Sequence, residues 1–217
     1  MSRLLTGINA GLAGVVYRAS MKPTEILSSE HRVIEQVLDC LDQIVHEANT
    51  TGQLDADSAT DAVDFFRTFA DQCHHGKEEV HLFPAMEAKG FPRHGGPTGV
   101  MLAEHDQGRD CVRQMRAAIP AAAQGDRAAL QQFSVAAENY SALLRQHIQK
   151  EDHCLFSMAD NAFSAADQAA LLAKFEKVEA EEMGAGTHEK LLGIAGALAK
   201  KFGVAPRAGQ AHACCHH

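Results

Sequence analysis

Most of the chain consists of long segments in which apolar residues recur every three or four positions, a spacing that predicts amphipathic helices. The first segment runs from Thr24, which follows Pro23 and is suited to cap a helix, to about Glu47. Similar patterns occupy three further long segments, at residues 57–89, 100–123 and 127–159. Four long amphipathic helices with short connections predict an all-α fold, an antiparallel up-and-down four-helix bundle.

Shorter patterns and a loop signal divide the rest of the chain. Ser164–Glu182 and Thr187–Phe202 predict extra C-terminal helices, hinged at residues 184–186. The segment from Gly90 to Gly99 carries two prolines and four glycines, which predict a loop between two halves. We therefore expect an N-terminal extension, a bundle, a C-terminal helical extension and a flexible His/Cys-rich tail, at residues 1–23, 24–160, 161–203 and 204–217.

Composition narrows the class of protein. The 217 residues carry 28 acidic and 20 basic side chains, a formal charge of -8, which argues against nucleic acid or an anionic membrane as a partner. The apolar run Leu4–Val16 is too short and too rich in glycine to span a membrane, and it makes a weak signal peptide. The six cysteines do not resemble a secreted disulfide framework, so we expect a reduced, cytoplasmic protein. The unusual feature is the 13 histidines, where function is to be sought.

The strongest signal is an internal match between the second and fourth segments. Residues His74–Phe83, HHGKEEVHLF, align without gaps on His147–Phe156, HIQKEDHCLF, with the shared frame H-x-x-K-E-x-x-x-L-F. A histidine and a glutamate four residues apart lie on one helix face, one turn above the other, and can bind the same ion or neighbouring ions. The chain thus holds two predicted chelating pairs, His74 with Glu78 and His147 with Glu151.

The phase of the second helix decides between two overlapping pairs. His75 and Glu79 have the same spacing as His74 and Glu78, but only the latter pair matches the second copy and continues the apolar face. His75 and Glu79 are therefore expected to point toward water. By the same spacing we expect three other inward residues further along the two helices, Val80, Cys154 and Met158. Pro84 is expected to kink or end the second helix.

The first and third helices each place a histidine after a glutamate on the inward stripe, in Glu30-His31 and Glu104-His105. Four histidines and two carboxylates would then converge from all four helices. Buried without partners, such groups would cost several kcal/mol each, and a bound cation removes that cost. Two divalent ions offer about 10 to 12 coordination positions, of which these side chains fill about eight, so the site is expected to be open.

As a set, these residues resemble the hemerythrin-like, HHE cation-binding family. The resemblance covers about Thr24 to Met158 and is carried by EHR at 30–32, CHHGKEEVHLFPAM at 73–86, MLAEHDQGR at 101–109 and RQHIQKEDHCLF at 145–156. It implies an antiparallel four-helix bundle with a non-haem di-iron centre, two iron ions bridged by carboxylates and an oxo or hydroxo group. The ligands it implies are His31, His74, Glu78, His105, His147 and Glu151. Imidazole and carboxylate also suit zinc or manganese, which are the alternatives.

The chain departs at two places from the oxygen-carrying members that it resembles. One turn after His105 it has Arg109 where a second histidine would fall, and His147 and Glu151 are separated by four residues instead of five. The resemblance then implies a centre that reacts with dioxygen, peroxide or nitric oxide, an oxidoreductase if it turns over. The alternative is an iron or oxygen sensor, or a metal-binding module, without turnover. The expected partner is a small diatomic or peroxide ligand, and the sequence identifies no protein partner.

Further residues near the motifs remain open in their role. His81, three residues after Glu78, is the first candidate for a fifth imidazole, ahead of His75 and His46. Tyr140, two turns before His147, is a candidate catalytic residue whose hydroxyl would donate a proton or trap a radical, with core packing as the alternative.

Two lysines of the repeat and the C-terminal tail carry weaker signals. Lys77 and Lys150 hold equivalent places in the repeat and are expected to be solvated or paired with carboxylates. The tail, AHACCHH at 211–217, carries ligands that suit copper or zinc, but its adjacent cysteines fit one closed site poorly, so an unstructured end is expected.

Overall fold

The computed structural model describes residues 21–182 and 186–207, and its regular structure there is helical throughout, without a strand. The all-α prediction is confirmed for this part of the chain. The expectations for residues 1–20, for most of the 184–186 hinge and for the tail from 208 onward lie outside the described residues. None of the described helices combines the length and the hydropathy that crossing a bilayer requires.

The first half of the chain forms two long rods. Helix α2 (Pro23–Thr51) begins with a proline, whose fixed backbone angle suits a first helical turn, and ends at Gly52, whose left-handed φ of 74° favours glycine. The second rod begins with α3 (Ala56–Phe65), where the Asp55 side chain accepts a hydrogen bond from the Ser58 amide. It continues through η1 (Phe66–His75), η2 (Glu78–Leu82) and α4 (Phe83–Ala88).

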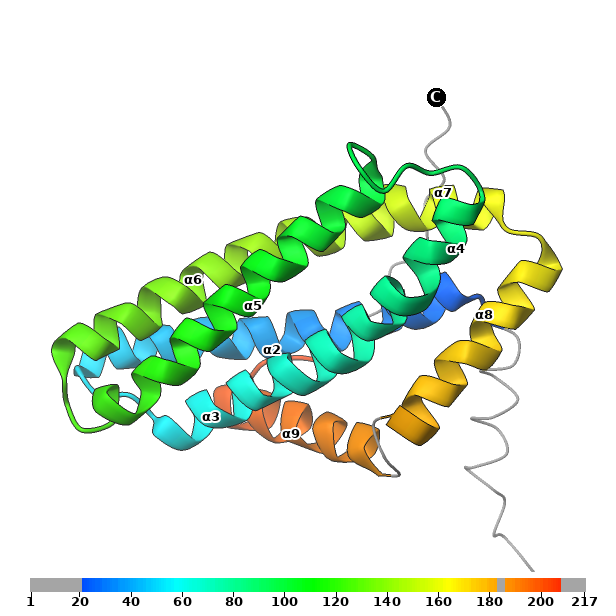
Figure 1. Ribbon diagram of the computed structural model, residues 1–217. Helices are drawn as coiled ribbons and strands as arrows, with labels where there is room; N and C mark the ends of the chain where they lie inside the picture. The colour runs from blue at the N-terminus through cyan, green and yellow to red at the C-terminus, as the bar shows by residue number, and fades with distance from the viewer. Residues whose placement is uncertain (1–20, 183–185, 208–217) are drawn as a thin grey trace, which may run out of the picture.

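The second half repeats this plan. Helix α5 (Pro97–Ala122) leads through a short turn to α6 (Arg127–Lys150), which Asp126 caps by accepting from two backbone amides. The last rod continues through η3 (Glu151–Leu155) and α7 (Phe156–Ala162). The chain reverses direction between successive rods, and α5 lies beside α6 along most of its length (Figure 1).

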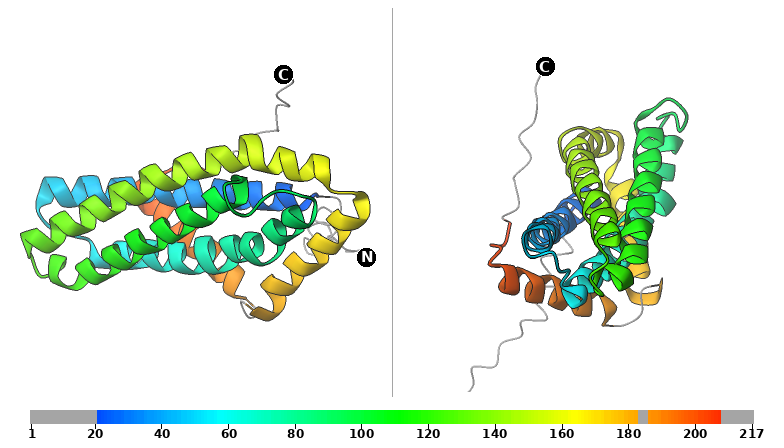
Figure 2. Two further views of the ribbon diagram at one scale, coloured as in Figure 1. Left: turned by 45° about the horizontal axis from the view of Figure 1, so that its top comes forward. Right: turned by 90° about the vertical axis from the view of Figure 1, so that its left-hand side faces the viewer.

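The remaining helices lie on the outside of these rods. Helix α8 (Ala165–Lys177) continues into η4 (Val178–Glu182) and contacts α2 and η2. Helix α9 (Thr187–Phe202) packs along α2 and α3, on one side of the molecule (Figure 2). The α8–η4 helix and α9 begin and end close to the boundaries predicted from the sequence, Ser164–Glu182 and Thr187–Phe202.

A buried polar layer divides the core into two apolar clusters. The larger cluster includes Ile34, Phe66 and Leu144, and the smaller includes Leu27 and Phe156. Each rod contributes buried histidines or glutamates between these clusters, namely His31, His74, His75, Glu78, His105, His147 and Glu151. Such a layer is unusual because buried polar groups cost free energy unless they find partners.

Each repeat contains π-helical turns, in which hydrogen bonds run from residue i to i+5 and the turn is wider than in an α-helix. Three predicted inward positions in and after these turns are therefore wrong. Val80 is 61% exposed, and Cys154 and Met158 also lie at the surface. Leu82, Leu155 and Phe156 fill the core instead. Pro84 does not end the rod: it occupies the first turn of α4, directly after π-helical η2, and the helix continues to Ala88.

Candidate metal centre

Two groups of buried side chains, each able to hold a metal ion, share one carboxylate in the polar layer. Within each group the ligand atoms all lie within 4.8 Å of one another. We call them group A, which consists of His31, His74, Glu78 and Glu151, and group B, which consists of His75, Glu78, His105 and His147. Residues from all four rods therefore meet at one place.

Each of the two glutamates lies between a histidine of group A and a histidine of group B. Glu78 has one oxygen 3.7 Å from His74 Nε2 and the other 3.5 Å from His105 Nε2. Glu151 Oε2 lies 3.2 Å from the Nε2 atoms of both His31 and His147. Two carboxylates so placed are in position to bridge two ions.

Most of these inward atoms have no hydrogen-bond partner. His31 Nε2 and all four carboxylate oxygens of Glu78 and Glu151 are buried without one, and the same holds for both ring nitrogens of His75. The distance between His31 Nε2 and Glu151 is short, but the geometry is not that of a hydrogen bond. Unpaired groups in a dry interior cost roughly 1–3 kcal/mol each. A pair of divalent cations fits the donor set, since imidazole nitrogen and carboxylate oxygen are the ligands that iron, zinc and manganese accept.

Carboxylates on the outer side fix the orientation of four histidine rings. The Nδ1 atoms of His31, His74 and His147 lie 2.9 Å from a carboxylate oxygen, and that of His105 lies 2.7 Å away. The four carboxylates, in the order of those histidines along the chain, belong to Asp152, Glu30, Glu79 and Glu104. An Nδ1 that donates to a carboxylate leaves the Nε2 lone pair facing the centre, as metal-binding histidines require.

These outer contacts obey an approximate twofold symmetry that follows the sequence repeat. Glu30 pairs with His74 and Lys77, and Glu104 pairs with His147 and Lys150. In the same way, Asp152 pairs with His31 and Arg32, whereas Glu79 pairs with His105 and Arg109. Each half of the molecule therefore orients a histidine of the other half.

The pKa values of the buried groups in the polar layer shift in opposite directions, because burial and neighbouring charges act differently on each group. Burial and the nearby Glu151 raise the pKa of Glu78 well above its usual range. Burial also opposes ionisation of Glu151, but His147 and His31 outweigh it and hold the pKa of that carboxyl well below 4.5. Burial and the neighbouring His75 lower the pKa of His105 to about 3. Such opposite shifts within a single site are typical of functional clusters.

His75 faces the centre, and the expectation that it points toward water was wrong. It is 4% exposed, and its ring stacks on that of His105 with 3.7 Å between centroids. The cause is the π-helical stretch of η1: the wider turn lets two consecutive histidines, His74 and His75, face inward together. A spacing of 3.6 residues per turn places His75 on the outer face, so the sequence ranked it behind His81 as a candidate for the fifth imidazole.

The other candidates lie outside both groups. His81 is half-buried beside Phe175, with 6.5 Å between ring centroids. Tyr140 is buried edge-on against Phe66, and burial, together with Asp71 and Cys111, raises the pKa of its phenol well above 10. The structure thus places the Tyr140 ring in the larger apolar cluster.

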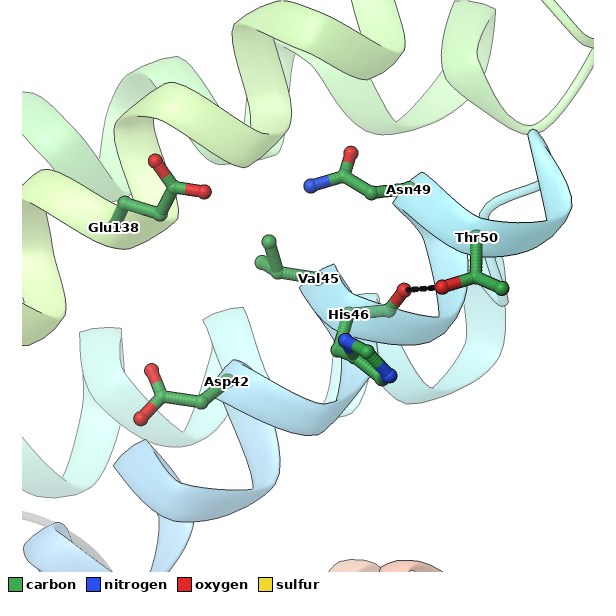
Figure 3. A pocket seen from close by; sticks show the side chains of 6 residues that line it. All are labelled: Asp42, Val45, His46, Asn49, Thr50 and Glu138. Carbon is green, nitrogen blue, oxygen red and sulfur yellow. Dashed lines mark hydrogen bonds between the residues drawn. The ribbon is translucent and has the colours of Figure 1, made fainter.

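His46 lies at the other end of α2, in an open groove between α2 and α6 (Figure 3). The groove has a volume of about 410 Å³ and is lined by Asp42, Val45, His46, Asn49, Thr50 and Glu138. Fifteen helical residues separate His46 from His31, a rise of roughly 22 Å. The groove is therefore not part of the centre.

Comparison with known proteins agrees with this geometry. The sequence model of a protein family, the hemerythrin HHE cation binding domain, matches residues 22–159 of this chain. Uncharacterized proteins of Mycobacterium bovis and Mycobacterium tuberculosis are 23% identical to the chain over 180 residues, which cover 83% of this chain and 70% of theirs. No solved structure is significantly similar to the chain.

Proposed function

Because the chain belongs to the hemerythrin HHE cation-binding family, we propose that its four rods form an antiparallel bundle around a di-iron centre that reacts with dioxygen, peroxide or nitric oxide. The observation that supports this most strongly is the set of buried, unpaired nitrogen and oxygen atoms in groups A and B. They are costly in an apolar interior and are satisfied together by two cations.

The two groups offer unequal numbers of imidazoles. Group A would contribute two and group B three, and Glu78 and Glu151, which lie between histidines of both groups, would be shared by the two ions. An ion in group A would therefore keep more coordination positions for a small exogenous molecule. Iron supplies the redox chemistry when it is bound, with zinc and manganese as alternatives on ligand type.

The chain's own residues prepare the site. The four outer carboxylates hold the imidazoles in one tautomer and one orientation, so little reorganisation is needed when metal binds. The two apolar clusters exclude bulk water from both sides of the polar layer. Four cysteines of the described chain are free thiols, which suits a reducing cytoplasm, where we place the protein.

A sensor or metal-binding module without turnover is the second candidate. It is favoured by the contact of α8 with η2, which carries Glu78, because a change at the centre would reach the surface through that contact. Turnover separates the two functions: an oxidoreductase consumes peroxide or nitric oxide over many cycles, whereas a sensor changes state once.

The proposal is tested first by elemental analysis of the purified full chain. We expect two iron ions per chain and, after oxidation in air, visible absorption from ligand-to-iron charge transfer. Addition of nitric oxide or peroxide to the reduced protein under anaerobic conditions should then change that spectrum. Iron-loaded protein with no visible band and no response to either molecule would contradict the redox function, and zinc at two per chain would favour the alternative metal.

A further inference from the structure

The two halves of the centre differ in how far water reaches them. Lys77 and Lys150 occupy equivalent places in the repeat, and each pairs with the equivalent outer glutamate, Glu30 or Glu104. Yet the Lys77 side chain is fully buried, whereas that of Lys150 is 42% exposed. The expectation that each lysine is solvated or paired with a carboxylate holds for both, but only Lys150 also reaches solvent. A part of the chain must therefore cover the surface around Lys77 and Glu30, which we call the Lys77 face, and leave the equivalent surface around Lys150 and Glu104 open.

That part is the C-terminal helical segment. Glu179 of η4 accepts a hydrogen bond from Lys77 Nζ at 2.6 Å. The Phe175 ring of α8 lies over the same ammonium group, 5.9 Å from Nζ to the ring centroid. Both residues come from the segment after the four rods, and no counterpart of either covers Lys150 among the described residues.

The contact continues inward to a metal-ligand candidate. Lys77 pairs with Glu30, and Glu30 Oε2 lies 2.9 Å from His74 Nδ1. An unbroken chain of polar contacts therefore runs from Glu179 through Lys77 and Glu30 to His74, one of the two histidines of group A. Glu30, Glu179 and His188 lie close enough together to suggest another cation site, but the Lys77 ammonium already pairs with both carboxylates.

We propose that α8 and η4 close the Lys77 face of the metal centre, so that metal exchanges with solvent through the Glu104–Lys150 face. Glu179 is the positioning residue that holds this closure, because it anchors the segment to the ammonium behind Glu30 and His74. The equivalent face carries a half-exposed lysine and a partly exposed Glu104, which give water and ions a polar route. This inference rests on the proposed metal-binding function.

The test measures how quickly bound iron escapes. The full chain is loaded with Fe²⁺ under anaerobic conditions and mixed with excess 2,2′-bipyridine, and the coloured chelate is followed with time. The informative variant is Glu179→Gln, which keeps the size of the side chain and removes its charge. We expect iron release to be about tenfold faster, the lower end of the effect that losing an outer partner of a metal ligand usually has.

Two control variants separate closure from general loosening. Glu176→Gln removes an exposed carboxylate from α8 close to Glu179 in sequence. Lys201→Met breaks the attachment of α9 to Asp55 and Ser58, at the far end of the segment. Both should release iron at the wild-type rate. Release from Glu179→Gln at the wild-type rate, or equal acceleration in all three variants, would overturn the proposal.

Hydrogen exchange of the metal-free chain keeps the inference testable even if iron binding fails. If the wild type retains no iron, the proposed function is wrong, while the closure is still measured by the amides of residues 74–82. We expect faster exchange there in Glu179→Gln than in Glu176→Gln. Equal exchange in these two variants would show that Glu179 does not hold the face closed.

Discussion

The imidazole rings of His75 and His105 stack almost in parallel, 12° apart, with 3.7 Å between their centroids. This contact joins the second rod to the third and places His75 in group B, beside His147. Both of its ring nitrogens are buried without a hydrogen-bond partner. A buried imidazole of this kind has a clear use as a metal ligand and little use as a packing residue.

Replacement of His75 by alanine should therefore lower the metal content. We expect affinity at group B to fall by at least the roughly 10- to 100-fold typical of losing an outer-shell partner, so that about one ion per chain remains after desalting. Elemental analysis checks this. His81→Ala is the matched control on the same rod, because His81 lies outside both groups, and its metal content should equal that of the wild type. A reversed result would make His81 the fifth imidazole.

Replacement of Glu104 by glutamine should weaken metal binding through the orientation of His147. The amide presents either an oxygen or an NH₂ group to Nδ1, so the ring is no longer held in one tautomer. We expect metal affinity to fall roughly 10- to 100-fold, measured by competition with a chelator. Glu138→Gln, on the same helix as His147 but in the open groove, should bind metal as the wild type does. Equal losses in both variants would point to a charge effect at long range.

Replacement of Glu78 by glutamine should stabilise the metal-free chain while it abolishes stabilisation by metal. The pKa of Glu78 is raised in the folded state by burial and by Glu151, so folding favours its protonated form. Stability from this group is therefore present below its unfolded pKa and is lost as pH rises toward the folded pKa. The advantage of Glu78→Gln over the wild type should grow from about pH 4.5 upward. Melting curves of both metal-free proteins at several pH values provide the measurement, and a gap that shrinks with pH would contradict the assignment.

Substitutions at Val80 and Leu82 should differ sharply, because Val80, expected to face inward from α-helical spacing, is exposed while Leu82 is buried. Val80→Lys introduces a charge at a position that is 61% exposed, so the free energy of unfolding should change by less than about 0.5 kcal/mol. Leu82→Ala removes a fully buried side chain and should cost about 2–5 kcal/mol. Urea denaturation of the two metal-free variants measures both values. A large loss in Val80→Lys would mean that the second rod is α-helical after His75.

The sequence predicted most of the fold because amphipathic spacing, capping residues and the Gly90–Gly99 loop are local signals. It also identified the paired motif that contains His74 and Glu78. What it missed depends on π-helical turns, which shift every later residue to another face, as at Val80. It had no signal for the contact between Lys77 and Glu179, since these residues are 102 positions apart and belong to elements with no shared pattern.

The approximate twofold arrangement also ties metal capture to completion of the chain. The first two rods supply three members of group A, but the fourth, Glu151, comes from the last rod, and group B takes two members from each half. A nascent or clipped chain that ends before the last rod offers neither cage in full. A metal ion would thus be taken up in full coordination only after both halves have docked, which keeps an incomplete chain from holding metal at an unfinished site.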